Sequence, residues 1–254
     1  MKIVRFTFDK KVKYGISEGE TIRSLEDKPY RHLKLSDEYH QLSEVTLLSP
    51  CVPSKIVALG INYHSHAEEV NAHLPDAPLL FLKPPTAVIG PEENISYPPS
   101  AHRVDYEGEL GVVIKKPVWR ASIEDALDYV LGYTCFNDVP ARDLQHQDRQ
   151  WTRSKSFDTF AALGPCIETE LDPGNVTLET YLNGELKQKG NTSDLIYSIP
   201  VLINFISHVM TLLPGDIIAT GTPGGIGPMN PGDTVEIKID GIGTLKNYVI
   251  SGGQ

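Results

Sequence analysis

The stretch Glu107-Gly108-Glu109-Leu110-Gly111-Val112-Val113-Ile114 decides how we expect this 254-residue chain to fold. With Val104, Asp105 and Tyr106 before it, the sequence alternates between apolar side chains and acidic or small ones. This period of two is the pattern of a β-strand whose two faces meet different surroundings. We therefore predict a strand over residues 104–114, with an apolar face in the core and the two glutamates on the opposite face.

The two glutamates of this strand predict a cation site. Residues i and i+2 of a strand point the same way with Cα atoms roughly 6.6 Å apart, so Glu107 and Glu109 can converge on one ion. Asp138 follows a second apolar strand, expected over residues 131–136. Three carboxylates without a nearby Cys or His select Mg²⁺, Mn²⁺ or Ca²⁺, and an open three-ligand site suits catalytic Mg²⁺. A solvated acidic sheet face is the alternative, and spacing alone does not place Asp138 beside the glutamates.

A polar segment with two histidines follows the buried strand expected over residues 55–59. His66 and Glu69 are three residues apart and would share one face of a helix. A carboxylate beside an imidazole holds its tautomer and raises its basicity, which is typical of a general base. We expect a short helix or a flap over residues 64–73, and an exposed surface pair is the alternative. The pattern His64-Ser65-His66 could instead bind zinc, but we find no further histidines after recognisable barrel strands.

Two lysines lie where a fixed cation would serve an anionic substrate. Lys155 lies in Ser154-Lys155-Ser156-Phe157, and Lys83 lies in Phe81-Leu82-Lys83-Pro84. Either could bind a substrate carboxylate or the negative charge that develops on an enolate. A solvated surface lysine is the alternative for each.

A glycine-rich loop spans residues 220–228 after an expected strand. It matches neither G-x-x-x-x-G-K-[ST] nor G-x-G-x-x-G, because Asn230 stands where the third glycine of the latter would be. A turn that offers backbone N–H groups and the Thr222 hydroxyl to a carboxylate is one interpretation. A plain tight turn is the other.

The remaining pattern indicates a β-rich α+β protein rather than a regular βαβ alternation. Residues 1–48 suggest a small β-rich unit, and the prolines of Ser49-Pro50-Cys51-Val52-Pro53 mark its end. We predict two domains, residues 1–50 and 51–254. Helices are expected over 122–129, with Ser122 as N-cap, and over 198–213, with Ser198 as N-cap. Further short strands are expected over 217–220, 234–239 and 244–250.

Composition narrows the class of protein. The formal net charge of −10 argues against a nucleic-acid surface, which needs clustered Lys and Arg. Three widely separated cysteines without a CxxC argue against a zinc ribbon or a thioredoxin-like site. The first residues resemble no signal peptide, and no run approaches the ~20 apolar residues of a membrane span. We expect a cytoplasmic protein with reduced thiols and without a membrane partner.

Taken together and in order, these motifs resemble the fumarylacetoacetate hydrolase superfamily, over about residues 54–249. The bacterial acylpyruvases and 2-hydroxyhepta-2,4-diene-1,7-dioate isomerases are the members that it resembles. The motifs that carry the resemblance are Gly60-x-Asn62-Tyr63-x-x-His66-Ala67-x-Glu69, Phe81-Leu82-Lys83-Pro84, Glu107-Gly108-Glu109-Leu110-Gly111, Asn137-Asp138-Val139-x-Ala141-Arg142-Asp143-Leu144-Gln145, Lys155-Ser156-Phe157-Asp158, Pro214-Gly215-Asp216 and Thr220-Gly221-Thr222-Pro223-x-Gly225-x-Gly227.

The resemblance implies a β-sandwich roll preceded by a small N-terminal domain, in an enzyme that is usually a homodimer. It implies that Glu107, Glu109 and Asp138 bind Mg²⁺ or Mn²⁺. His66 and Glu69 correspond to an acid/base dyad on a lid that orders with substrate, and Lys155 to a catalytic lysine beside the metal. The positions expected to contact substrate are Tyr63, Lys83, Arg142, Gln145 and Thr222.

The expected substrate is a small oxo or enol carboxylate. We favour hydrolysis of a C–C bond in an acylpyruvate-type 2,4-dioxo acid, in which the metal stabilises an enolate and the dyad activates water. Decarboxylation or isomerisation of oxaloacetate-like or 2-hydroxyhepta-2,4-dienedioate-like substrates uses the same chemistry and is the alternative. A non-catalytic module that binds a metal or a carboxylate is the alternative from another class.

Overall fold

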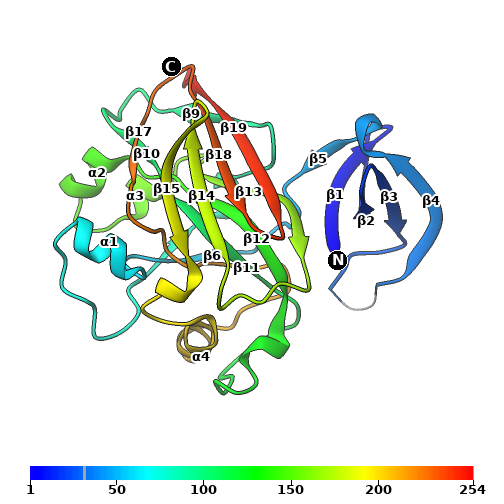
Figure 1. The fold of residues 1–254 in the computed structure, drawn as a ribbon, viewed down its shortest axis with the longest axis horizontal. Helices are drawn as coiled ribbons and strands as arrows, with labels where there is room; N and C mark the ends of the chain where they lie inside the picture. The colour runs from blue at the N-terminus through cyan, green and yellow to red at the C-terminus, as the bar shows by residue number, and fades with distance from the viewer. Residues whose placement is uncertain (31–32, 254) are drawn as a thin grey trace.

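Two packed β-sheets form the body of the protein in the computed structural model, which describes residues 1–30 and 33–253 (Figure 1). Within this part of the chain the larger sheet has twelve strands: β1 (Lys2–Phe8), β2 (Lys11–Glu18), β3 (Thr21–Leu25), β4 (Leu35–Gln41), β5 (Thr46–Leu48), β6 (Ile56–Leu59), β7 (Leu80–Lys83), β8 (Val88–Ile89), β11 (Gly108–Ile114), β12 (Val130–Asp138), β13 (Ala161–Glu168) and β16 (Ile217–Ala219). The main path of this sheet is β4-β3-β2-β1-β13-β12-β11-β16-β6-β7, while β5 pairs with β1 and β8 with β13.

The smaller sheet has the order β15-β14-β18-β19-β9 and packs against strands β11, β12 and β13 of the larger one. Its strands are β9 (Asn94–Tyr97), β14 (Thr177–Leu182), β15 (Glu185–Asn191), β18 (Thr234–Ile239) and β19 (Gly243–Ser251). Leu110 and Val112 meet Leu178 and Ile237 in the shared core. The predicted β-rich α+β class and the sandwich are confirmed.

The strand that we predicted over residues 104–114 is divided at Glu107. Its first part, β10 (Val104–Tyr106), pairs with β17 (Gly227–Met229), whereas β11 pairs with β12 and β16. The prediction of one continuous strand was therefore wrong. Its apolar face is buried as expected, but the acidic face is buried as well, with Glu109 only 1% exposed.

The N-terminal strands join the larger sheet through β1. Lys2 and Ile3 pair with Glu168 and Ile167 of β13, and β1 also pairs with β2 and β5. Figure 1 shows β1 to β4 as a separate lobe beside the sandwich. The division into residues 1–50 and 51–254 stays our proposal.

The helices are short and lie at the edges of the sandwich (Figure 1). The α-helices are α1 (His64–Glu69), α2 (Arg142–Gln147), α3 (Thr152–Lys155) and α4 (Ile199–Val209), and the 3₁₀ turns are η1 (Leu42–Glu44), η2 (Pro85–Ala87), η3 (Ala126–Tyr129) and η4 (Thr192–Asp194). Among the described residues, no helix is both long and apolar enough to cross a bilayer.

Two helix predictions need correction. The helix expected over 122–129 is only the 3₁₀ turn η3, although the Ser122 hydroxyl does accept a hydrogen bond from the Asp125 N–H at 3.2 Å. The helix expected over 198–213 ends at Val209, because the Leu212 backbone pairs with Val118 instead. An extended partner satisfies these backbone groups as well as another helical turn would.

Asp216 fastens the start of β6 to the turn before β16. Its buried carboxylate accepts hydrogen bonds from the Ser54 N–H (2.9 Å), the Ser54 hydroxyl (2.6 Å) and the Leu213 N–H (2.8 Å), and it also pairs with Lys55. Strands β6 and β16 are parallel neighbours. Asp216 therefore joins the two chain segments that lead into these strands.

We predict that Asp216→Ala lowers the free energy of unfolding by about 3 kcal/mol, because it removes the buried carboxylate that accepts hydrogen bonds from Ser54 and Leu213 and pairs with Lys55. Urea unfolding measures this loss. Asp240→Ala, which removes an exposed carboxylate, should change stability by less than about 0.5 kcal/mol. Equal effects of the two substitutions would contradict this role of Asp216.

Candidate metal centre and active site

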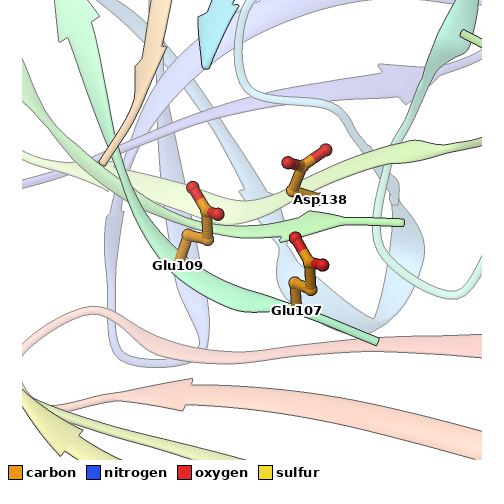
Figure 2. Close-up of side chains that lie close together, drawn as sticks. All are labelled: Glu107, Glu109 and Asp138. Carbon is orange, nitrogen blue, oxygen red and sulfur yellow. The ribbon is translucent and has the colours of Figure 1, made fainter. Parts of the chain in front are cut away.

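Glu107, Glu109 and Asp138 come together on the face of the larger sheet that points away from the smaller sheet, as Figure 2 shows. One carboxylate oxygen from each lies within 4.8 Å of the others, and all three residues are buried. The register of β11 and β12 produces this arrangement, because Gly108 lies opposite Asn137 and the Asp138 N–H donates to the Glu107 carbonyl at 2.9 Å. The pairing of strands thus supplies the proximity of Asp138 that spacing alone did not.

Cationic side chains surround two of the three carboxylates. Lys155 Nζ lies 2.7 Å from Glu107 Oε2 and 2.7 Å from Asp138 Oδ2. Arg142 donates to Glu107, and Lys83 donates to Asp138. Glu109 accepts a hydrogen bond from the Gly221 N–H at 2.9 Å, but it forms no ion pair with any described residue.

Because, among the described residues, only Glu107 has cationic partners, the pKa values of the two glutamates shift in opposite directions. Burial would raise the pKa of Glu107, but Lys155 and Arg142 lower it to about 2. Burial raises the pKa of Glu109 well above its ordinary value, and the neighbouring Asp138 and Glu107 raise it further. Burial also lowers the pKa of Lys83 to about 8, partly offset by Asp138, whereas for Lys155 the two acids outweigh burial and raise the pKa.

The three carboxylates fit a divalent cation. Their donor set contains only oxygen, which suits Mg²⁺ or Mn²⁺. A cation among them would also compensate the charge of Glu109, which no side-chain cation of the described residues pairs with. Glu107, Glu109 and Asp138 would therefore hold the ion, as the sequence analysis expected.

A cleft of about 190 Å³ lies beside this triad. Glu107, Lys155, His66, Arg142 and Gln145 all line it. Five residues expected at the site, from four separate motifs, therefore meet at one cleft.

The His66–Glu69 pair lies on α1, as predicted. His66 Nδ1 is 3.2 Å from Glu69 Oε2, and Glu69 Oε1 accepts a hydrogen bond from the Gly225 N–H at 3.0 Å. Asp194 of η4 caps the helix by accepting bonds from the Ser65 N–H (3.1 Å) and hydroxyl (2.7 Å). Contacts to two distant loops thus hold this six-residue helix over the cleft.

Of the residues expected to contact substrate, Arg142 and Gln145 lie at the cleft, whereas Lys83 is buried. Arg142 and Gln145 line the cleft, and the Arg142 guanidinium also bonds Asp105 (2.9 Å) and Gln145 (2.6 Å). Lys83 is fully buried and donates to Asp138 and to the Val139 carbonyl. For all of these residues a contact with substrate stays a prediction.

Two other expected contacts are buried near the triad. The Thr222 hydroxyl donates to the Gly108 carbonyl at 2.8 Å. Tyr63 is fully buried, and its hydroxyl finds no hydrogen-bond partner in residues 1–30 and 33–253. Substrate contacts by Thr222 and Tyr63 also stay predictions.

Sequence reasoning missed several residues of the site. Asp105 is buried and pairs with both Arg103 and Arg142, which fixes the guanidinium that contacts Glu107. Its place on the acidic face of the strand was a signal that could have revealed it. Trp151 lines the cleft and packs edge-on against Phe81, with ring centroids 5.2 Å apart, but no local pattern marks it.

We predict that Glu109→Gln stabilises the metal-free protein at neutral pH. The unfolded chain has an ordinary glutamate pKa of about 4.3, whereas the metal-free fold raises the pKa of Glu109. The folded state therefore holds the proton more tightly, and this stabilisation is lost as pH rises from the unfolded towards the folded pKa. The melting temperature of the variant in EDTA should exceed that of wild type at pH 8, and the two should converge near pH 4.

Adding Mn²⁺ should raise the melting temperature of wild type and have little effect on Glu109→Gln, because the variant lacks one ligand. Glu124→Gln, which changes an exposed glutamate, should behave as wild type in both conditions. A metal-free Glu109→Gln protein that melts below wild type at pH 8 would refute the prediction.

Comparison with known proteins agrees with this geometry. The family model described as Fumarylacetoacetate (FAA) hydrolase C-terminal matches residues 55–250, and the model described as Rv2993c-like, N-terminal matches residues 1–50. Oxaloacetate tautomerase YisK of Bacillus subtilis is 44% identical over an alignment 231 residues long, which covers 85% of this chain and 77% of YisK.

Two solved structures share the whole fold. The 2-hydroxyhepta-2,4-diene-1,7-dioate isomerase from Mycobacterium marinum is 42% identical with a TM-score of 0.94, and all of both chains is covered. The maleylpyruvate hydrolase from Sphingobium sp. SYK-6, in complex with manganese(II) and pyruvate, is 32% identical with a TM-score of 0.82, again over both whole chains. The chain therefore belongs to the fumarylacetoacetate hydrolase family, with an N-terminal region of the Rv2993c-like type.

Proposed function

We propose that this protein is a divalent-metal-dependent enzyme that transfers protons on a small 2-oxo or enol dicarboxylic acid. The observation that carries the proposal is the shared cleft, which the His66 imidazole, Lys155 and Glu107 all line. An acid/base group, a fixed cation and a metal ligand at one cavity are the parts that enolisation needs.

The arrangement of the site suggests a separate role for each group around the cleft. Mg²⁺ or Mn²⁺ held by Glu107, Glu109 and Asp138 would act as a Lewis acid towards the 2-oxo and carboxylate oxygens of a substrate. Lys155 adds a buried positive charge where negative charge develops, because its acidic partners raise its pKa and keep it protonated. Arg142 and Gln145 offer donors in the same cleft to a second carboxylate.

His66 and Glu69 would move the proton. With Nδ1–H donated to Glu69, the Nε2 atom of His66 is the nitrogen that accepts a proton from a substrate carbon or from water. Glu69 is itself fixed by the Gly225 N–H, so the dyad keeps its orientation. The helix that carries it covers the cleft and limits the access of water to a reactive enolate.

We place tautomerisation or isomerisation first among the outcomes. The name of YisK, oxaloacetate tautomerase, and that of the Mycobacterium marinum isomerase support it, since both proteins exceed 40% identity. Hydrolytic C–C cleavage of an acylpyruvate, favoured by the sequence analysis, is the second candidate, and the likeness to a maleylpyruvate hydrolase supports it. We also propose a homodimer, as the family resemblance implies, and a cytoplasmic location, which suits three buried free thiols.

We predict that the purified protein with Mg²⁺ or Mn²⁺ accelerates the enol–keto conversion of oxaloacetate or the isomerisation of 2-hydroxyhepta-2,4-dienedioate. Acylpyruvates and fumarylpyruvate in the same spectrophotometric panel test the hydrolytic candidate, and release of carbon dioxide tests decarboxylation. EDTA and Glu109→Ala should each abolish turnover. Full metal-dependent activity in Glu109→Ala would show that the metal site is assigned wrongly.

His66→Ala should lower kcat by about 10²- to 10⁴-fold, the range expected for loss of a general acid/base. Binding of oxalate by the Mn²⁺-loaded variant, measured by calorimetry, should stay close to wild type. His73→Ala, which changes an exposed histidine after α1, is the matched control and should keep wild-type turnover. Loss of both oxalate binding and turnover in His66→Ala would instead indicate a structural role.

A further inference from the structure

The amide of Gln188 holds the peptide segment between the two glutamate ligands. Gln188 lies in β15 of the smaller sheet, and its side chain is 1% exposed. Its Oε1 accepts a hydrogen bond from the Gly108 N–H at 3.0 Å. Its Nε2 donates to the Thr222 hydroxyl (2.8 Å) and to the Pro223 carbonyl (2.9 Å), and Thr222 in turn donates to the Gly108 carbonyl (2.8 Å).

These bonds form a closed ring around Gly108. Both backbone groups of that residue are bound, one by Gln188 and the other by Thr222. Because Glu107 and Glu109 flank Gly108 in the chain, these hydrogen bonds help to set the orientation of their Cα–Cβ bonds, together with the pairing of β11 with β12. Gln188 makes all three of its polar contacts inside the protein, so its amide orientation is fixed.

Close packing supports the same ring. A Cβ at Gly108 would lie 2.2 Å from Thr180 Oγ1, and one at Gly190 would lie 2.6 Å from Pro223 Cβ. Gly225 has φ +97°, and a Cβ there would lie 2.3 Å from the Lys187 carbonyl oxygen. At Gly108, β11 therefore packs closely against β14, whose Thr180 pairs with Gln188, and the glycine-rich loop packs closely against β15 at Lys187 and Gly190, on either side of Gln188.

The glycine-rich loop connects this ring of hydrogen bonds to the acid/base dyad His66–Glu69. The loop that Gln188 binds at Pro223 continues to Gly225, whose N–H holds Glu69. The same loop begins at Gly221, whose N–H holds Glu109. One loop, fastened to β15 by Gln188, thus contacts both the metal triad and the lid helix.

We propose that Gln188 is a positioning residue, which sets the geometry of Glu107 and Glu109 for the metal and aligns the glycine-rich loop with them. Gln188 is not among the described residues that line the cleft, and its amide bonds Gly108, Thr222 and Pro223 rather than a carboxylate of the triad, so it acts through Gly108 and Thr222. This inference rests on the proposed metal site. Groups that orient metal ligands typically contribute 10- to 100-fold to metal affinity.

The test compares Gln188→Met with Asn247→Leu. Met preserves the length of the side chain and removes all three hydrogen bonds of Gln188. Asn247 is an equally buried amide of the same sheet, which donates to the Gly90 (2.8 Å) and Glu93 (2.9 Å) carbonyls in a region without triad residues. Both variants should melt below wild type, since each leaves buried polar groups unpaired.

Titration of the metal-free proteins with Mn²⁺, followed by the electron paramagnetic resonance of the free ion, separates the two roles. Gln188→Met should raise the Kd for Mn²⁺ by about 10-fold, whereas Asn247→Leu should keep it within about twofold of wild type. Unchanged Mn²⁺ affinity in Gln188→Met, or equal weakening in both variants, overturns the inference. Wild-type protein that does not bind Mn²⁺ overturns the metal site itself. If Gln188→Met does not fold, Gln188→Asn, which shortens the amide by one methylene, carries the same expectation and the same refuting result.

Discussion

Mutual repulsion among three buried carboxylates is the constraint on which the rest of this structure depends. Glu107, Glu109 and Asp138 lie within reach of one another, away from water. Burying each charge costs roughly several kcal/mol unless it is paired. Lys155, Lys83 and Arg142 compensate Glu107 and Asp138, whereas Glu109 retains a raised pKa in the metal-free protein. A divalent cation at the triad would supply the positive charge that Glu109 does not receive from the side chains of residues 1–30 and 33–253.

Paired β-strands hold the carboxylates of the triad in place. Antiparallel pairing of β11 with β12 sets Glu107 beside Asp138, and the smaller sheet closes over Gly108 between the two glutamates. The glycine-rich loop joins this rigid part to α1, which carries His66 and Glu69 and has few contacts of its own. A rigid triad under a short, externally fastened helix suits a reaction in which substrate must enter before a proton moves.

The comparisons and the site together explain why one family can include tautomerases, isomerases and hydrolases. Each of these reactions develops negative charge on a 2-oxo acid, which Lys155 and a cation at the triad would stabilise. They differ in where the proton goes and whether water attacks. Under the proposed function, the residues that line the cleft beyond the triad, such as Trp151, Phe81 and Gln145, would select among these outcomes.

The sequence by itself determined the β-rich class and the acidic strand from local periodicity, and it indicated His66 and Glu69 as a candidate dyad from their spacing. Asp138 entered as the third candidate ligand only through the resemblance to the family. Sequence reasoning missed the break at Glu107, because β10 pairs with β17 far along the chain. It also missed the early end of α4, because Leu212 pairs with the distant Val118. It also missed Trp151 and Gln188, which have no local signature. Only the tertiary structure decided that Asp138 lies opposite Glu107, because strand register is set by pairing across the sheet and not by spacing along the chain.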